Sequence, residues 1–262
     1  MSDEKMLAAK ADGIGRMTFN NPERRNAVSL EMWDRAEAIL RDFAADDAVR
    51  VIVLTGAGGK AFVSGADISK FESERASLEA AQAYNARVDG LLAGLIDLPK
   101  PTIAEIDGFC IGGGLGLAVA CDLRFCSAKS QFGLPAAKLG LGYRYAGLKR
   151  LVDTVGAGVA RDITFSGRRL DAAEALAVGL VQKVLPDGAL ADFVTEYATT
   201  VAANAPLTIK GIKIMINEAL KPESEQDPAL WKQLVDDAFT SEDYIEGRRA
   251  FMEKRTPQFK GR

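Results

Sequence analysis

Three consecutive glycines, Gly112 to Gly114, constrain the fold of this chain more than any other feature of its sequence. They follow an apolar stretch at 102–106 and precede small residues that continue to Ala120, so they mark a junction between a strand and a helix. Glycine allows positive φ and lets bare N–H groups approach a ligand, and the start of a helix adds further unpaired donors. The run therefore suits a phosphate or a developing oxyanion, with close packing of two backbones as the alternative explanation.

A second glycine-rich stretch follows residues 51–55, whose apolar side chains predict a buried strand. The loop 56–60 contains three glycines, and the segment from Ala61 to Ile68 then reads Ala-Phe-Val-Ser-Gly-Ala-Asp-Ile. Neither stretch carries the Gly-Lys-Ser/Thr of a P-loop, and neither has the dinucleotide-binding spacing with an acidic residue on the next strand. Nucleotide binding through these turns is therefore the weakest hypothesis for this chain.

Together, the patterns Ala-Phe-x-x-Gly-Ala-Asp-Ile and Gly-x-x-x-Gly-Gly-Gly-x-x-x-Ala-x-x-Cys-Asp resemble the crotonase (enoyl-CoA hydratase/isomerase) family. The resemblance extends over nearly the whole chain. It implies an α/β fold, with a spiral of ββα units over residues 1–195 that binds acyl-CoA. It also implies a C-terminal helical region, 196–262, that forms a homotrimer or a dimer of trimers and closes the CoA site. Coenzyme A would then be part of the substrate, with no separate cofactor and no metal.

The composition limits the partners, the cellular location and the proton-transfer residues that this chain can have. The net charge of −3 gives no reason to expect nucleic acid as a partner, and no apolar run approaches the length of a membrane span. The three cysteines, Cys110, Cys121 and Cys126, lie in apolar surroundings and predict buried free thiols in a reducing cytoplasm. The chain has no histidine, so proton transfer must use a carboxylate, tyrosine, lysine, cysteine or water.

The order of elements independently favours an α/β layered fold with a parallel sheet, because strand pairs alternate with helices. Strands are expected at 5–11, 14–19, 51–55, 102–106, 123–127 and 180–185, and helices from 30 and at 77–96, 148–155, 158–165 and 172–178. From Ala189 onward, three helical patterns are separated by Pro206, Pro222 and Pro228. The second of these has a broad apolar face, which we expect to pack against another subunit. That face is formed by Leu207, Ile209, Ile212, Ile214, Met215 and Leu220.

In crotonase-like proteins, one N–H from each glycine-bearing bend converges on the thioester oxygen. Carried onto this chain, these donors are the amides of Ala66 and Gly113, which would stabilise an enolate where charge develops. The resemblance also implies residues that bind the CoA moiety, with a solvated basic face as the alternative for each charged member. They are Arg25, Asn26, Ala27, Ala66, Asp67, Ile68, Phe251 and Lys254. For Asp67, fixing its own loop is the simpler role.

The hydratases of the family use two glutamates, and this chain has Gly116 and Ala136 at those positions. Hydration needs a base for the water and an acid for the α carbon, which neither residue supplies. The acidic position of dienoyl-CoA isomerases falls near Arg144. Tyr143 stands at a position that resembles the tyrosine of methylmalonyl-CoA decarboxylase. That decarboxylase also has glycine at the position of Gly116, but it has histidine at the position of Ala66. A packed aromatic of the pocket wall is the alternative for this tyrosine.

We therefore expect a lyase that decarboxylates a malonyl-type CoA in fatty acid metabolism, with Ala66, Gly113 and Tyr143 as catalytic residues. Two alternatives stay open: an enoyl-CoA hydratase/isomerase with an atypical acid/base, and a CoA-binding pseudoenzyme without turnover. Among other carboxylates, Glu105 and Asp122 are expected to be structural anchors. A base recruited from Glu72 or Glu74 cannot be located from the sequence.

Overall fold

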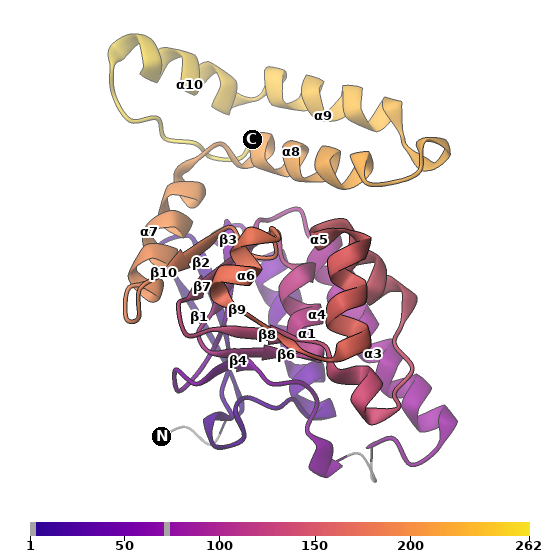
Figure 1. Cartoon of the computed structure of the whole chain (residues 1–262). Coiled ribbons are helices and arrows are strands. Elements are labelled where there is room, and N and C mark those ends of the chain that lie inside the picture. Colours follow the sequence, from indigo (N-terminus) through magenta and orange to yellow (C-terminus); the bar gives the residue numbers. More distant parts are fainter. Residues whose placement is uncertain (1–3, 71–73) are drawn as a thin grey trace.

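A computed structural model of the chain describes residues 4–70 and 74–262 (Figure 1). Within them, the larger sheet has the spatial order β1-β2-β3-β5-β7-β10, with β1 antiparallel to β2 and the other neighbours parallel. These strands are β1 (Met6–Ala11), β2 (Ile14–Phe19), β3 (Val51–Gly56), β5 (Thr102–Ile106), β7 (Leu123–Ser127) and β10 (Lys183–Leu185). The predicted α/β architecture with a parallel sheet is confirmed.

A smaller sheet has the order β4-β6-β8-β9, with β9 antiparallel to β8. Its strands are β4 (Ala61–Val63), β6 (Phe109–Ile111), β8 (Gln131–Gly133) and β9 (Arg169–Asp171). Strands β4, β6 and β8 each follow a strand of the larger sheet in the chain, and each leads toward a helix. This repeat of two strands and one helix is the predicted spiral of ββα units.

Helices cover both faces of the larger sheet (Figure 1). The helices of the core are α1 (Leu30–Ala45), α3 (Leu78–Asp97), α4 (Gly113–Ala120), α5 (Tyr145–Ser166), α6 (Ala172–Ala177) and α7 (Leu190–Ala203). Short 3-10 turns are η1 (Pro22–Arg24), η2 (Ile68–Lys70) and η3 (Pro135–Leu139). Helices α1, α3 and α4 bury their apolar side chains on one face, and α7 packs on the opposite face.

Local sequence explains where the first elements begin. Asp12 and Gly13 turn the β1–β2 hairpin with φ values of 51° and 79°, as Asp-Gly at this place predicts. The hydroxyl of Ser29 accepts a hydrogen bond from the Met32 N–H and caps α1, and Ser77 caps α3 in the same way through Ala80. The two helices therefore begin within one residue of the expected positions, 30 and 77.

Two predicted elements differ from the structure. The helices expected at 148–155 and 158–165 form one element, α5, interrupted at Gly156, where φ is 76° and ψ is 160°. Glycine adopts this conformation without a steric penalty, so the chain bends there and continues. The strand expected at 180–185 is only three residues long, because Leu180 and Val181 donate their N–H groups to Ala175 O rather than to a sheet.

The C-terminal region contains four helices rather than the three expected. After α7 come α8 (Pro206–Ala219), the short η4 (Glu223–Glu225), α9 (Pro228–Thr240) and α10 (Glu242–Glu253). The missed break lies at Ser241, whose hydroxyl caps α10 without any proline or glycine nearby. The predicted boundary between 195 and 196 falls inside α7, and α7 packs along the sheet through Val194, Ala198 and Ala202. In Figure 1, α8, α9 and α10 form a separate lobe beyond the core.

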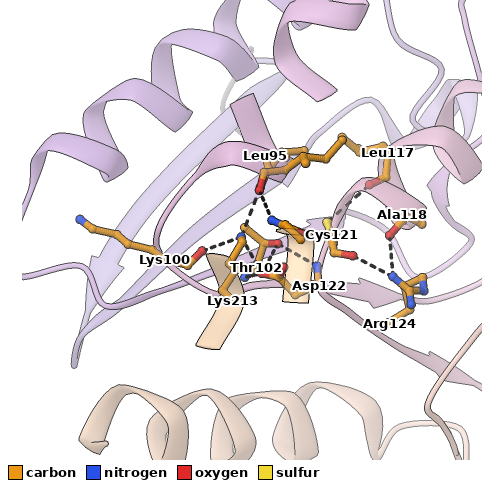
Figure 2. Close-up of polar contacts among 11 residues, drawn as sticks. Leu95, Lys100, Thr102, Leu117, Ala118, Cys121, Asp122, Arg124 and Lys213 are labelled. Atoms are coloured by element: carbon orange, nitrogen blue, oxygen red, sulfur yellow. Dashed lines mark hydrogen bonds and ion pairs between the residues drawn. The ribbon is translucent and has the colours of Figure 1, made fainter. Parts of the chain in front are cut away.

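A buried cation joins this lobe to the core (Figure 2). The Lys213 ammonium group of α8 lies 2.8 Å from Asp122 Oδ2 and donates to the carbonyls of Leu95 and Lys100. Asp122 also accepts from the N–H and hydroxyl of Thr102. Within one chain, α8 does not bury the apolar face expected for it. Its buried residues are Gly211, Lys213 and Glu218. The apolar side chains of α8 instead line two hollows of about 650 and 870 Å³.

The prediction that the three cysteines are buried and free is confirmed for Cys110, Cys121 and Cys126. Burial raises the pKa of Cys121 and of Cys126 to about 12, so these thiols stay protonated near neutrality. Of the helices in the described part of the chain, none combines the length and apolar character needed to cross a bilayer.

Candidate active site

The two glycine-bearing bends lie against each other. An ideal Cβ on Gly114 would come within 2.1 Å of the Val63 carbonyl oxygen, so only glycine permits this approach of α4 to β4. Gly65 and Gly112 face each other across the junction, each with positive φ (106° and 57°). An ideal Cβ on Gly112 would lie 3.9 Å from Gly65 Cα. The sequence predicted this meeting of the two bends, and glycine is what makes it sterically feasible.

The amides of Ala66 and Gly113 are oriented away from the surrounding ladders. Val28 donates to Gly65 O and accepts from the Asp67 N–H, so the Ala66 N–H of this parallel bridge points to the opposite side. Gly113 is the first residue of α4, and the N–H of a first helical residue has no intrahelical acceptor. Within residues 4–70 and 74–262, neither amide donates to a backbone carbonyl. Both can therefore donate to a ligand.

Both amide-bearing residues line one cavity of about 540 Å³. Its walls come from the two bends, from one face of α3, and from the segment between η3 and α5. The side chains from α3 are Ala81, Tyr84, Asn85, Val88 and Leu92. This volume lies within the range of small-molecule sites, and the lining is mainly apolar, so the amides would act in surroundings with little competing water.

Tyr143 enters the cavity beside Gly116. An ideal Cβ on Gly116 would lie 3.6 Å from the Tyr143 hydroxyl oxygen, and one on Gly147 would lie 3.1 Å from the ring. The two glycines thus form a slot that the phenol fills. Burial raises the pKa of Tyr143 above its ordinary value, with a smaller opposing effect from Arg144. The hydroxyl is therefore neutral at physiological pH and able to donate a hydrogen bond.

Among the described residues that line the cavity, the charged side chains are Arg75 and Arg144, and neither aspartate nor glutamate is present. Gly116 and Ala136 both line the cavity wall. Arg144 donates to Asn85 O at 2.6 Å and lies 3.0 Å from Asp89 Oδ1. These contacts connect the Tyr143 segment to α3.

Sequence reasoning missed an aromatic arrangement behind the Gly113 bend. The Trp33 indole N–H donates to the Tyr84 hydroxyl at 2.8 Å, and the guanidinium carbon of Arg75 lies 3.8 Å from the Tyr84 ring centroid. An ideal Cβ on Gly113 would lie 3.6 Å from Trp33 Cζ2. The helical spacing 81, 84, 85, 88 and 92 was the available signal for this wall, since these positions share one face of a helix.

The residues predicted to bind the CoA moiety fall into two groups. The first lies on two loops that are hydrogen-bonded to each other, and two of its members, Ala66 and Ile68, line the cavity: Arg25, Asn26, Ala27, Ala66, Asp67 and Ile68. In this group Asn26 is fully buried, and its side-chain amide donates to Ala57 O and Ala61 O. Asp67 accepts from Arg24 and from Ser69, so it fixes the loop as expected. Arg25 and Ile68 are exposed to solvent.

The second group, Phe251 and Lys254, is not brought to the cavity by this chain. Both lie at the end of α10, where Phe251 is 82% exposed and Lys254 has a left-handed φ of 54°. Neither lines the cavity of Ala66, and Figure 1 shows α10 on the far side of α8 from η1 and η2. Within one chain the lobe therefore extends away from this cavity, and the expectation that the C-terminal region closes the CoA site stays a prediction.

The other carboxylates considered in the sequence analysis, where the structure describes them, form hydrogen bonds outside the cavity. Glu74 accepts from the Leu30 N–H at the start of α1, and Glu105 accepts from Arg16 and Thr55. Asp122 takes part in the anchor to Lys213. Glu72 lies outside the described residues.

Comparison with known proteins shows the family and the fold of this chain. The family model described as "Enoyl-CoA hydratase/isomerase" matches residues 9–262. The chain is 32% identical to a short-chain-enoyl-CoA hydratase of Clostridium acetobutylicum, covering 97% of each chain. An enoyl-CoA hydratase/carnithine racemase from Magnetospirillum magneticum superposes with a TM-score of 0.95 at 35% identity, covering 100% of this chain and 97% of that one. An enoyl-CoA hydratase from Bacillus anthracis has a TM-score of 0.93 at 30% identity, covering 99% and 100%.

The spiral fold and the paired bends define an enzyme class that acts on acyl-CoA thioesters. The chain belongs to the enoyl-CoA hydratase/isomerase family.

Proposed function

We propose that this protein decarboxylates a malonyl-type CoA thioester. The observation that carries the proposal is the neutral, half-buried Tyr143 side chain beside Gly116, in a cavity whose described lining has two available amides and no carboxylate. Decarboxylation suits this set, because the substrate brings its own carboxylate and the site must only stabilise the resulting enolate.

In this reaction the bond between the α carbon and the carboxylate breaks, and its electron pair enters the thioester as an enolate. The Ala66 and Gly113 N–H groups donate to the enolate oxygen, where the negative charge collects as carbon dioxide leaves. A proton then moves to the α carbon, supplied by the Tyr143 hydroxyl directly or through water. The raised pKa of Tyr143 keeps that proton on the phenol until it is needed.

A second candidate is an enoyl-CoA hydratase or isomerase that uses an atypical acid/base. The printed names of similar proteins favour it, since relatives that match over nearly their whole length are hydratases. Hydration would need a general base at the attacking water, and the described lining offers none at the two glutamate positions. A CoA-binding protein without turnover is the outcome if neither reaction occurs.

The proposal also covers the oligomeric state, the cellular location and the metabolic role of the protein. We expect a homotrimer or a dimer of trimers, supported by the large apolar side chains that one chain leaves exposed on α9 and α10. These are Phe239, Ile245, Phe251 and Met252. A neighbouring copy would then supply Phe251 and Lys254 to the CoA site. A cytoplasmic location and a role in fatty acid metabolism are the matching expectations, with coenzyme A as part of the substrate and no separate cofactor.

An acyl-CoA panel tests the proposal. Methylmalonyl-CoA and ethylmalonyl-CoA are followed by mass spectrometry for loss of carbon dioxide, and crotonyl-CoA is followed by loss of its conjugated absorbance. We expect carbon dioxide release and no hydration. Hydration of crotonyl-CoA without decarboxylation would establish the second candidate, and tight binding of acetyl-CoA with neither reaction would indicate the pseudoenzyme.

A further inference from the structure

A guanidinium group stacked on a buried tyrosine forms one corner of the cavity that contains the two amides. The guanidinium carbon of Arg75 lies 3.8 Å from the centroid of the Tyr84 ring, and both residues line this cavity. Tyr84 is only 3% exposed, whereas Arg75 is half-buried. A cation this close to a ring face is attracted by it, so the stack fixes the position of the guanidinium group. We call Arg75 and Tyr84 the cationic corner.

The hydroxyl group of Tyr84 is held in position and still has a proton to donate. Its oxygen accepts a hydrogen bond from the Trp33 indole N–H at 2.8 Å. A phenol that accepts such a bond keeps its own O–H as a donor, and within residues 4–70 and 74–262 this O–H has no protein acceptor. A buried donor without an acceptor is costly, so a ligand group that accepts from Tyr84 would be favoured.

The corner supplies positive charge to a lining that has no carboxylate among the described residues. The charged side chains of that lining are Arg75 and Arg144, and Arg144 already contacts Asn85 O and the Asp89 carboxylate of α3. A guanidinium group carries several N–H donors in a planar fork, so contacts within the protein and the stack on Tyr84 still leave donors for a ligand. The described surroundings of the corner therefore favour an anionic group over a neutral one.

The corner lies beside the place where the acyl group would bind. An ideal Cβ on Gly113 would lie 3.6 Å from Trp33 Cζ2, and one on Gly116 would lie 3.6 Å from the Tyr143 hydroxyl oxygen. Gly113 and Gly116 are three residues apart on α4, so they share one face of the helix, with about 5–6 Å between such Cβ positions. Tyr84, which is hydrogen-bonded to Trp33, therefore lies toward the Gly113 end of this face, and Tyr143 lies one turn further. A thioester whose oxygen meets the Gly113 amide would place its acyl substituents between the two phenols.

We propose that the cationic corner binds a carboxylate of the acyl group and so selects acidic acyl-CoA thioesters. The inference rests on the proposed function, whose malonyl-type substrate carries such a carboxylate, and it assigns the recognition of that group to Arg75 and Tyr84. The guanidinium edge and the Tyr84 O–H each donate a charge-assisted hydrogen bond to the carboxylate. The mainly apolar remainder of the lining gives an unpaired carboxylate no compensation for its lost water, so the corner is what makes its entry favourable.

The corner should act on binding rather than on the chemical step. As the bond to the α carbon breaks, negative charge leaves the carboxylate and moves to the enolate oxygen at the amides. The contact with Arg75 is therefore weaker in the transition state than in the bound substrate, so it lowers KM without raising kcat. Loss of the Tyr143 hydroxyl should instead lower kcat, so kinetics distinguish the two roles.

A matched pair of unreactive thioesters tests the corner without turnover. Sulfoacetyl-CoA carries a sulfonate where malonyl-CoA has its carboxylate, and it cannot release carbon dioxide. Methylsulfonylacetyl-CoA has a methyl group in place of one sulfonate oxygen and is neutral at that position. In calorimetric titrations, the parent should bind the sulfonate about tenfold more tightly than the sulfone. Arg75→Met keeps an unbranched side chain over the Tyr84 ring and should remove this preference by raising the Kd for sulfoacetyl-CoA, with less than about a twofold change for methylsulfonylacetyl-CoA.

Two further variants give a graded effect and a control. Tyr84→Phe removes only the hydroxyl group and should raise the Kd for sulfoacetyl-CoA about threefold. Arg87→Met removes the same charge as Arg75→Met, but Arg87 pairs with Asp34 on the surface and does not line the cavity, so both Kd values should stay within about twofold. With methylmalonyl-CoA, Arg75→Met should raise KM about tenfold and leave kcat unchanged or higher.

The outcomes separate this inference from the proposed function. A parent that binds the two probes equally, or an Arg75→Met protein that keeps the preference or weakens both probes equally, overturns the corner. Release of carbon dioxide by that parent would leave the proposed function intact. A parent that prefers the sulfonate through Arg75 but releases no carbon dioxide from any malonyl thioester supports the corner and overturns decarboxylation. A fall in kcat with unchanged KM in Arg75→Met would also contradict the corner, because it would place Arg75 in the chemical step.

Discussion

The core and the C-terminal lobe both contain helices that carry large apolar side chains, but the two regions are stabilised differently. In the core, α1 buries six apolar side chains. The amides of the cavity are positioned by glycines such as Gly114, where an added Cβ would collide with the neighbouring backbone. In the lobe, α9 buries no residue, and α10 buries only Asp243 and Ala250. Its connection to the core through α8 depends on the buried Lys213 ammonium group.

This difference shows that apolar spacing alone does not tell where a helix buries its surface. The core satisfies its apolar faces within one chain, whereas the lobe leaves Phe251 and Met252 about four-fifths exposed. Monomeric proteins rarely leave such large apolar groups together in solvent. The core is thus complete within one chain, and the lobe is the part whose stability should respond to its few polar contacts and to association.

The largest expected effect comes from a substitution that forces the two glycine-bearing bends apart. Gly114→Ala would place a methyl group where an ideal Cβ lies 2.1 Å from Val63 O, so α4 and β4 must separate. Moving the Gly113 amide away from the Ala66 amide should lower kcat/KM by about 10²–10³, the usual loss for one oxyanion donor. Steady-state kinetics on the active substrate of the panel measure this loss.

Gly116→Ala is the matched control on the same helix. Its methyl group would meet the Tyr143 hydroxyl at 3.6 Å, an ordinary contact, so the fold should be retained. Because alanine favours helix over glycine by about 1 kcal/mol, the thermal midpoint should stay level or rise. A Gly114→Ala protein as active as the parent would show that the close approach does not position the amides.

The next effect tests the connection of the lobe. Lys213→Met leaves Asp122 and the carbonyls of Leu95 and Lys100 without their buried cation, which should lower the unfolding free energy by about 3 kcal/mol. Urea denaturation measures the change. Lys232→Met is the control, because Lys232 pairs with Asp236 on the exposed surface and should contribute less than about 1 kcal/mol. Equal losses in the two variants would contradict a special role for the buried anchor.

A smaller effect concerns the pH dependence of the lobe itself. The Arg255 guanidinium group and the Gln258 N–H lower the pKa of Glu246 to about 2. A carboxylate with a lowered folded pKa adds stability above its ordinary pKa, and that stability is lost as pH falls from about 4.5 to 2. The urea midpoints of the parent and of Glu246→Gln should therefore differ near neutrality and converge in acid. Glu253→Gln, which removes a more exposed partner of the same arginine, should show little difference at any pH.

The sequence predicted most of the core because its signals there are local. Ser29 and Ser77 cap the helices that follow them, Asp12-Gly13 turns the first hairpin, and the two glycine stretches meet as expected. Each of these features depends on a few adjacent residues whose backbone preferences are strong.

The remaining features depend on contacts between distant segments, which no local pattern encodes. Nothing near Gly156 indicates that α5 continues past it, and the α9–α10 break depends on a single serine cap. The partner of Lys213 lies 91 residues away in the sequence, and Arg25 and Arg169 both lie over the Phe109 ring of the smaller sheet. Tyr143 was located by resemblance, but its glycine slot required the packing of α4 against α5.

The most direct test of the account compares the parent with Tyr143→Phe in carbon dioxide release from methylmalonyl-CoA. Tyr143→Phe removes the hydroxyl that supplies the proton but keeps the apolar ring in the cavity wall. We therefore expect kcat to fall about a hundredfold while KM stays within about twofold. An unchanged kcat, or a parent that hydrates crotonyl-CoA and releases no carbon dioxide, would contradict it.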